Sequence, residues 1–389
     1  MKQVRRKDSK NRVLEKGESQ REDGTYMYRW TDLSKRRQTI YATTLNELRE
    51  KESQISNSED SFGVLWSKGK MTVRELVELH RKLKKVKITT QQKYKYYDKL
   101  MDEIGLSDIP IREIRTSVAK AYMIKLSDYG YSYGTVQNFK ASLSPAFQMA
   151  VEDDYITKNP FLFQLHHIID DDRKQRRSMS VEEEQTYLDF IKNHGWYKHT
   201  YADIFTLLKT GLRVSELYGL TVKDLDFKNN RIHVNKQLHY IEGKYMIMSP
   251  KSKAGTRVLA MTPEVRKVLL DQMTKPRPTV TQMVDGHTGF VFVNHNGNLK
   301  HRKNLQVTMM NIRDDLAKMG KTNFSDVSPH VLRHTFCSRM IENGMDVKTL
   351  QIIMGHSDIG TTLNVYTHLE PEDAAKTMEK VLSTCASNA

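Results

Sequence analysis

The stretch SPHVLRHTFCSRM, residues 328–340, places two basic side chains at a helix start in an otherwise apolar run. Ser328 is typical of an N-cap and Pro329 of the first helical position, so we expect a helix to begin at Pro329. His330 and Arg333 lie three residues apart and share one face of its first turn. Because the N–H groups of a first helical turn have no partners in the helix, the turn is a natural anion site. The alternative is an ordinary helix start with a solvated basic residue.

The composition favours a polyanion as the partner of this stretch. The chain has 389 residues, enough for two or three domains, and a formal net charge of +15. It has no long apolar segment, and its first residues, MKQVRRKDSKNR, lack the apolar stretch of a signal peptide. We therefore expect a cytoplasmic protein that binds nucleic acid and no membrane.

Cysteine and histidine usage argues against a disulfide framework or a metal site. The chain contains two cysteines, Cys337 and Cys385, and no Cys/His cluster with the spacing of metal ligands. No glycine-rich loop that could hold a phosphate is evident either. We expect the chain to need no metal and no cofactor.

Residues 1–57 have the pattern of a small β-sheet followed by a helix. The runs RVLEKG (12–17), TYMYRW (25–30) and QTIYA (38–42) predict three strands, and Asp23-Gly24 predicts the turn before the second strand. Basic and aromatic side chains on these strands suit DNA, because a β-ribbon fits the major groove. The alternative is an ordinary solvated sheet.

Residues 71–165 form an all-helical pattern that begins with a capping box, Thr72 with Glu75. About four helices are expected there, with lysines that suit contact with phosphates. A second capping box, Ser180 with Glu183, opens a mixed and mainly helical domain over residues 178–389.

Short strands are expected in the middle of this last domain, within residues 231–262 and at GFVFVN, residues 289–294. The fold class is therefore multidomain. It combines a three-stranded N-terminal sheet with one helix, an all-helical domain, and a mainly helical domain with a small β-sheet.

Three further stretches of the last domain carry candidate chemistry. TGLRVSELYGL, residues 210–220, places Arg213 and Glu216 three residues apart after a glycine. PKSKAGTR, residues 250–257, places Lys251 and Lys253 in the turn of a predicted β-hairpin. Alone, the arginine is explained by a buried ion pair, and the lysines by exposure to solvent.

The third stretch, MGHSDIGTTLNVYTH, begins at residue 354. It places His356 just past a glycine that ends a helix, and Tyr366 on the short helix that follows. Taken together, the candidate side chains indicate phosphodiester chemistry. Two arginines offer bidentate forks for a phosphate, histidines and a lysine move protons, and a tyrosine can act as the nucleophile.

In their order and approximate spacing these stretches resemble the tyrosine recombinases, or phage-type integrases. The helical domain looks like their core-site-binding domain, and residues 1–57 are similar to the arm-site-binding domain of integrases from conjugative transposons. The resemblance implies a DNA strand-exchange enzyme that integrates and excises a mobile element. Its expected partners are double-stranded DNA at crossover and distal arm-type sites, three further copies in a homotetramer, and an accessory excision factor.

The resemblance also implies a catalytic set: Arg213, Lys251, His330, Arg333, His356 and Tyr366. Tyr366 would form a 3′-phosphotyrosyl bond, and the choice of Lys251 over Lys253 as the general acid stays open. Two rivals also stay open. One is a tyrosine-type DNA topoisomerase, and the other is a DNA-binding regulator without catalysis. A terminal helix that starts at Pro371 is expected either to pack on its own domain or to pass to a neighbouring protomer.

Overall fold

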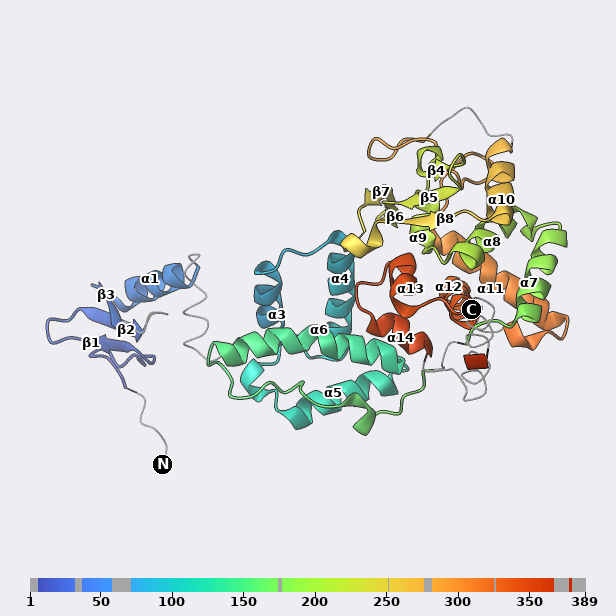
Figure 1. The fold of residues 1–389 in the computed structure, drawn as a ribbon. Coiled ribbons are helices and arrows are strands. Elements are labelled where there is room, and N and C mark those ends of the chain that lie inside the picture. Colours follow the sequence, from blue (N-terminus) through green and yellow to red (C-terminus); the bar gives the residue numbers. More distant parts are fainter. Residues whose placement is uncertain are drawn as a thin grey trace. The chain divides into compact units, whose positions relative to one another are not determined.

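The computed structural model describes residues 6–31, 37–57, 71–173, 177–250, 252–275, 282–324, 327–366 and 378–379. The chain divides into two compact units, residues 1–174 and 175–389. The predicted fold class is confirmed, because an N-terminal sheet with a helix, a helical bundle and a mixed domain follow one another along the chain (Figure 1).

The N-terminal module is a three-stranded antiparallel sheet, in the order β1-β2-β3, against which one helix packs. Its elements are β1 (Glu18–Gln20), β2 (Tyr26–Thr31), β3 (Arg37–Ala42) and α1 (Leu45–Asn57). Tyr26 and Tyr28 of β2 and Leu45 and Leu48 of α1 form its small core. The Asp23-Gly24 turn lies between β1 and β2, as predicted, with Gly24 at φ +83°.

The first strand does not lie where the sequence pattern places it. The run at residues 12–17 precedes β1, which begins at Glu18. Val13 of this run is 41% exposed, and only Leu14 packs against the core. The run alternates in polarity but has no continuous buried face, whereas Glu18 is buried and paired with Arg49. Alternation alone therefore misplaced the strand by several residues.

The helical domain contains four α-helices, as predicted. They are α3 (Val73–Lys82), α4 (Ile88–Glu103), α5 (Thr116–Asp128) and α6 (Tyr133–Glu152), with short 3₁₀ turns η2 (Ile111–Glu113) and η3 (Leu165–His167). Both halves of the Thr72–Glu75 capping box form at the start of α3. The long helix α6 packs against α3 and α5 (Figure 1). Its apolar face supplies much of a core that includes Phe139 and Phe147.

The second unit is organised around the buried helix α8. Its helices are α7 (Val181–Asn193), α8 (Tyr201–Thr210), α9 (Val214–Gly219), α10 (Pro263–Thr274), α11 (Arg302–Lys318), α12 (Pro329–Glu342), α13 (Val347–Met354) and α14 (Gly360–Tyr366). Short 3₁₀ turns are η4 (Tyr197–Thr200), η5 (Val222–Asp224), η6 (Lys253–Gly255) and η7 (Thr322–Phe324). Helices α7, α9, α10 and α12 pack against α8. The predicted caps at Ser180 and Ser328 both form.

Two small antiparallel sheets lie in this unit. Strands β4 (Leu225–Asp226), β5 (Arg231–Val234) and β8 (Arg257–Ala260) form one, and β6 (Gln237–Ile241) with β7 (Lys244–Met248) forms the other. The stretch 289–294, predicted as a strand, contributes only isolated bridges at Phe290 and Val293.

The prediction that Lys251 and Lys253 lie in the turn of a β-hairpin is wrong. The tight hairpin turn is Glu242-Gly243, where both residues have positive φ, and it joins β6 to β7. Strand β8 pairs with β5 in the other sheet, so residues 249–256 form a connection between sheets. The proline at position 250 lacks an N–H to donate to a ladder, which disfavours a continuous hairpin there.

Candidate active site

Two left-handed glycines end the helices that meet at the candidate site. Gly211 ends α8 at φ +63°, and Gly355 ends α13 at φ +62°. A Cβ on Gly211 would lie 2.4 Å from the ring of Phe336, and one on Gly355 would lie 3.0 Å from Arg257 Nη1. Both positions therefore require glycine, and their carbonyl groups are free to accept hydrogen bonds from outside the helix.

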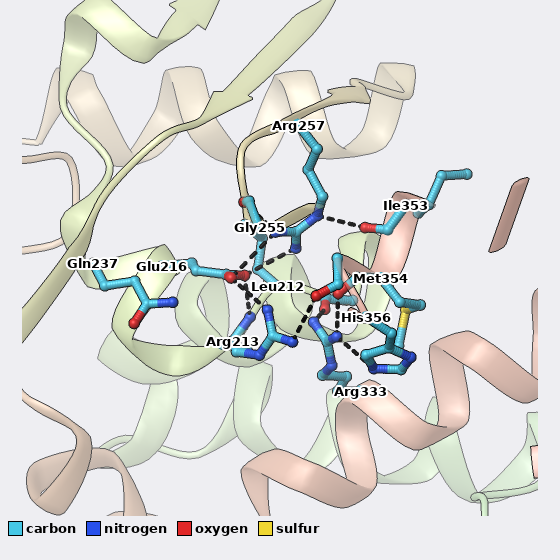
Figure 2. Close-up of polar contacts among 12 residues, drawn as sticks. Leu212, Arg213, Glu216, Gln237, Gly255, Arg257, Arg333, Ile353, Met354 and His356 are labelled. Atoms are coloured by element: carbon cyan, nitrogen blue, oxygen red, sulfur yellow. Dashed lines mark hydrogen bonds and ion pairs between the residues drawn. The ribbon is translucent and has the colours of Figure 1, made fainter. Parts of the chain in front are cut away.

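A fully buried carboxylate, Glu216 in the first turn of α9, lies at the centre of the site (Figure 2). Its Oε1 accepts from Arg213 Nη1 at 2.7 Å and from Arg257 Nη1 at 3.1 Å. Its Oε2 accepts from Arg257 Nη2 at 2.9 Å and from the backbone N–H of Arg213 at 2.9 Å. The two guanidinium groups thus converge on one carboxylate from different places, the N-cap of α9 and the start of β8.

The charge state of Glu216 follows from these contacts. Burial raises the pKa of its carboxyl, but the hydrogen bonds and charges of Arg257 and Arg213 outweigh burial and lower the pKa to about 2. Glu216 is therefore ionised at neutral pH, and it can orient both arginines permanently.

Arg333, near the start of α12, approaches the same place from the other side (Figure 2). Its Nη1 donates to Gly211 O at 2.6 Å, and its Nη2 donates to Met354 O and, at 2.9 Å, to His356 Nε2. Burial, followed by the charge of Arg213, lowers the pKa of Arg333 to about 9. The guanidinium remains protonated at neutral pH, although burial and the neighbouring arginines outweigh the opposing charge of Glu216.

His356 is held as a neutral ring. An arginine can only donate, so His356 Nε2 accepts from Arg333, and Nδ1 then carries the proton toward Thr362 Oγ1 at 3.0 Å. Burial and the charges of Arg333, Arg213 and Arg257 lower the pKa of His356 to about 4. This ring therefore donates or accepts hydrogen bonds near pH 7 but does not exchange protons readily there, unlike an ordinary histidine.

The structure brings Arg213, Arg333 and His356 together. His330 lies on the exposed side of α12, with Arg302 Nη2 at 3.4 Å from its Nε2. Tyr366 is the last residue of α14, as predicted, but its side chain lies outside the part of the chain that the structure describes. Lys251 also lies outside the described residues, as does the side chain of Lys253 at the start of η6.

The sequence reasoning missed Arg257. The sequence does contain a signal for it, because side chains alternate along a strand and Arg257 therefore shares a face with Leu259. In β8 this is the inward face. A charged residue on the apolar face of a strand requires a buried partner of opposite charge. Glu216 is that partner.

Comparison with known proteins gives family matches in two parts of the chain and relatives that cover nearly all of it. Residues 177–373 match the phage integrase family, and residues 1–59 match a family described as the DNA binding domain of Tn916 integrase. The transposase from transposon Tn916 of Enterococcus faecalis is 34% identical over 393 residues, which cover 97% of this chain and 96% of that protein. The transposase from transposon Tn1545 of Streptococcus pneumoniae matches to the same extent.

Solved structures of integrases are also similar to this chain. The Tn1549 transposon integrase in complex with a circular intermediate DNA has a TM-score of 0.75 and 35% identity, covering 80% of this chain and 99% of the solved one. A lambda integrase dimer bound to a core site, at 15% identity, has a TM-score of 0.52 over 91% of this chain and 95% of its own. That second likeness concerns the fold alone.

Proposed function

This chain belongs to the phage integrase family of site-specific DNA recombinases, and we propose that Tyr366 and the arginine cluster around Glu216 carry its chemistry. It is a tyrosine recombinase of the conjugative-transposon integrase type. The observation that best supports the proposed site is the link between His356 and Thr362, at 3.0 Å. It ties the arginine cluster to α14, and Tyr366 follows Thr362 by four residues, about one helical turn.

The cluster is suited to a phosphodiester because its charges do not balance. Arg213, Arg257 and Arg333 face the single carboxylate of Glu216. An anion placed against Arg213 and Arg333 would relieve their mutual repulsion. In our proposal these two guanidiniums hold the non-bridging oxygens of the scissile phosphate and stabilise the charge that grows there during cleavage. His356 would orient Arg333 toward the same phosphate, because its Nε2 accepts from that guanidinium.

The remaining roles complete one balanced step. The Tyr366 oxygen attacks phosphorus, its bond to phosphorus forms, and the bond from phosphorus to the 5′-oxygen breaks. His330 takes the proton of the Tyr366 hydroxyl, whose ordinary pKa near 10 requires assistance. Lys251 gives a proton to the departing 5′-oxygen. The phosphotyrosine keeps the energy of the phosphodiester, so attack by another 5′-hydroxyl rejoins DNA without ATP.

We propose three DNA-handling parts along the chain. Residues 1–57 bind distal arm-type sites, residues 71–165 bind the crossover site, and residues 178–389 cut and rejoin it. The relatives are named for transposons, and the similar Tn1549 structure contains a circular intermediate DNA, which supports integration and excision of a mobile element. A topoisomerase or a regulator without catalysis is disfavoured, because the transposon relatives match the N-terminal module as well.

Strand exchange between two duplexes requires four strand cuts, and each chain offers one Tyr366. We therefore propose that four copies assemble on DNA, with an accessory factor that favours excision. A DNA substrate also favours the bacterial cytoplasm as the place of action. In the described residues no helix is long and apolar enough to cross a membrane.

Removing residues 1–57 is expected to spare cleavage of the crossover site and to weaken binding at distal sites. The salt slope of distal binding should fall by about one for each phosphate that the shortened chain no longer neutralises. Electrophoretic mobility shifts at several salt concentrations, on both classes of site, measure this. If the shortened chain binds each class of site as tightly as the full chain does, the N-terminal sheet has no role in DNA binding.

Replacing Lys251 by alanine is expected to slow cleavage by about 100-fold, because general acid catalysis contributes on that scale. In a substrate with sulfur in place of the scissile 5′-oxygen, the leaving group is a thiolate that needs no proton. Cleavage of this substrate by Lys251→Ala should therefore recover most of the wild-type rate. Lys253→Ala is the matched variant two residues on, and we expect it to have little effect on either substrate. Rescue of Lys253→Ala alone would move the role of general acid to Lys253.

A further inference from the structure

Arg257 makes four hydrogen bonds that join three separate elements (Figure 2). Two go to the carboxylate of Glu216 on α9. Arg257 Nε donates to Ile353 O near the end of α13 at 2.5 Å, and Nη1 donates to Gly255 O in η6 at 3.2 Å. The side chain is only 2% exposed, so its guanidinium cannot itself contact DNA.

The turn held by Arg257, residues 252–255, packs closely against the chain at both of its ends. Gly255 N donates to Ser252 O at 2.9 Å and closes the turn. A Cβ on Gly255 would lie 2.4 Å from Pro250 Cβ, and a Cβ on Gly355 would lie 3.1 Å from Ala254 O. The backbone of η6 therefore approaches the end of α13 closely, where Gly355 takes a left-handed conformation that glycine adopts without strain.

This turn belongs to the segment that carries both candidate general acids. The backbone of Lys253 begins η6, and Lys251 precedes Ser252 in the chain. The segment connects two sheets, and its described residues, 249–250 and 252–256, belong to no strand. The contacts of Arg257 supply an anchor at its carboxyl end, against the same carboxylate that orients Arg213.

We propose that Arg257 is a positioning residue that holds the lysine-bearing turn at a fixed place relative to Arg213 and Glu216, so that the general acid reaches the leaving 5′-oxygen. The inference rests on the proposed function. Arg257 acts through the lysine, and its loss impairs protonation of the leaving group more than it impairs binding of the phosphate.

Arg257→Lys is the variant that tests the proposal, because it keeps the positive charge beside Glu216. A lysine is a point charge without the planar fork, so it cannot span Glu216, Gly255 O and Ile353 O together. The matched control is Lys236→Met, which breaks the buried pair between Lys236 and Asp224 elsewhere in the unit. It removes a buried ion pair of the same unit but does not touch the turn.

The experiment measures single-turnover cleavage by the full chain on paired substrates with oxygen or sulfur at the scissile 5′ position. We expect Arg257→Lys to cleave the oxygen substrate about 10-fold to 100-fold more slowly than wild type, and the sulfur substrate within about threefold of it. The ratio of sulfur to oxygen rates should thus rise as it does in the lysine variant. Lys236→Met should keep the wild-type ratio, whatever its stability.

Equal reductions in rate on both substrates would overturn the inference, because Arg257 would then act through the arginines or through folding. The proposed function fails by a different result. If wild type forms no covalent complex on either substrate, the recombinase chemistry is wrong. If neither Lys251→Ala nor Lys253→Ala prefers the sulfur substrate, the assignment of the general acid is wrong. If only Arg257→Lys prefers the sulfur substrate, Arg257 does not act through a lysine.

Discussion

Tyr366→Phe abolishes the covalent protein–DNA complex while DNA binding survives; this is the largest effect that we expect. The substitution removes one hydroxyl, which is the proposed nucleophile, and preserves the ring. Cleavage should fall by at least about a thousandfold, as for other removed nucleophiles. The Kd for DNA should stay within about tenfold, because a single hydrogen bond is worth about 0.5–1.5 kcal/mol.

The measurement uses a nicked, labelled duplex that traps the cleaved state, and separates bound from covalently linked DNA by denaturing electrophoresis. Tyr201→Phe is the matched control, since it removes a hydroxyl from α8 within the same unit. It should form the complex at the wild-type level. A covalent complex with Tyr366→Phe would show that another residue attacks the phosphorus.

Glu216→Gln is expected to have the second largest effect, on stability and on cleavage together. The variant keeps the shape of the side chain but leaves Arg257, 2% exposed, without an anion. Breaking a buried ion pair in this way costs about 3–5 kcal/mol of unfolding free energy. Arg213 is also deprived of its charged partner, so cleavage should fall more steeply than DNA binding.

The stabilisation by Glu216 should depend on pH in a defined direction. Its pKa in the folded chain, about 2, is below the ordinary value of 4.5. The contribution is therefore complete above the ordinary value and is lost as the pH falls toward the folded value. The difference between wild type and Glu216→Gln should be constant from pH 6 to pH 8 and should shrink below about pH 4.5.

Hydrogen–deuterium exchange of α9 at increasing urea concentration measures this unfolding locally. Glu342→Gln is the control, because it breaks an ion pair with Arg339 in which Glu342 is 45% exposed. That change should cost less than about 1 kcal/mol. A difference between wild type and Glu216→Gln that grows as the pH falls would contradict the assignment of an ionised Glu216.

The local signals of the sequence predicted the parts of the site that depend on near neighbours. Ser328 caps α12 and Gly355 ends α13, because capping and left-handed turns are decided within a few residues. The pairing of Arg213 with Glu216 was also accessible, since they are three residues apart in one helical turn.

Contacts between distant segments were not accessible in this way. Arg257 meets Glu216 across 41 residues, and Arg333 meets Gly211 O across 122 residues. Local patterns also misplaced the lysine-bearing segment, because sheet pairing decides whether a strand continues a hairpin or crosses to another sheet. The three-dimensional packing of α8, α12 and β8 supplies that information.

Formation of a phosphotyrosine at Tyr366, beside the arginine cluster, can be observed directly. The most direct test is mass spectrometry of the covalent complex trapped on a suicide duplex, after digestion of protein and DNA. We expect a nucleotide linked through its 3′-phosphate to the peptide that contains Tyr366. A nucleotide on any other peptide, or a linkage through a 5′-phosphate, would contradict it.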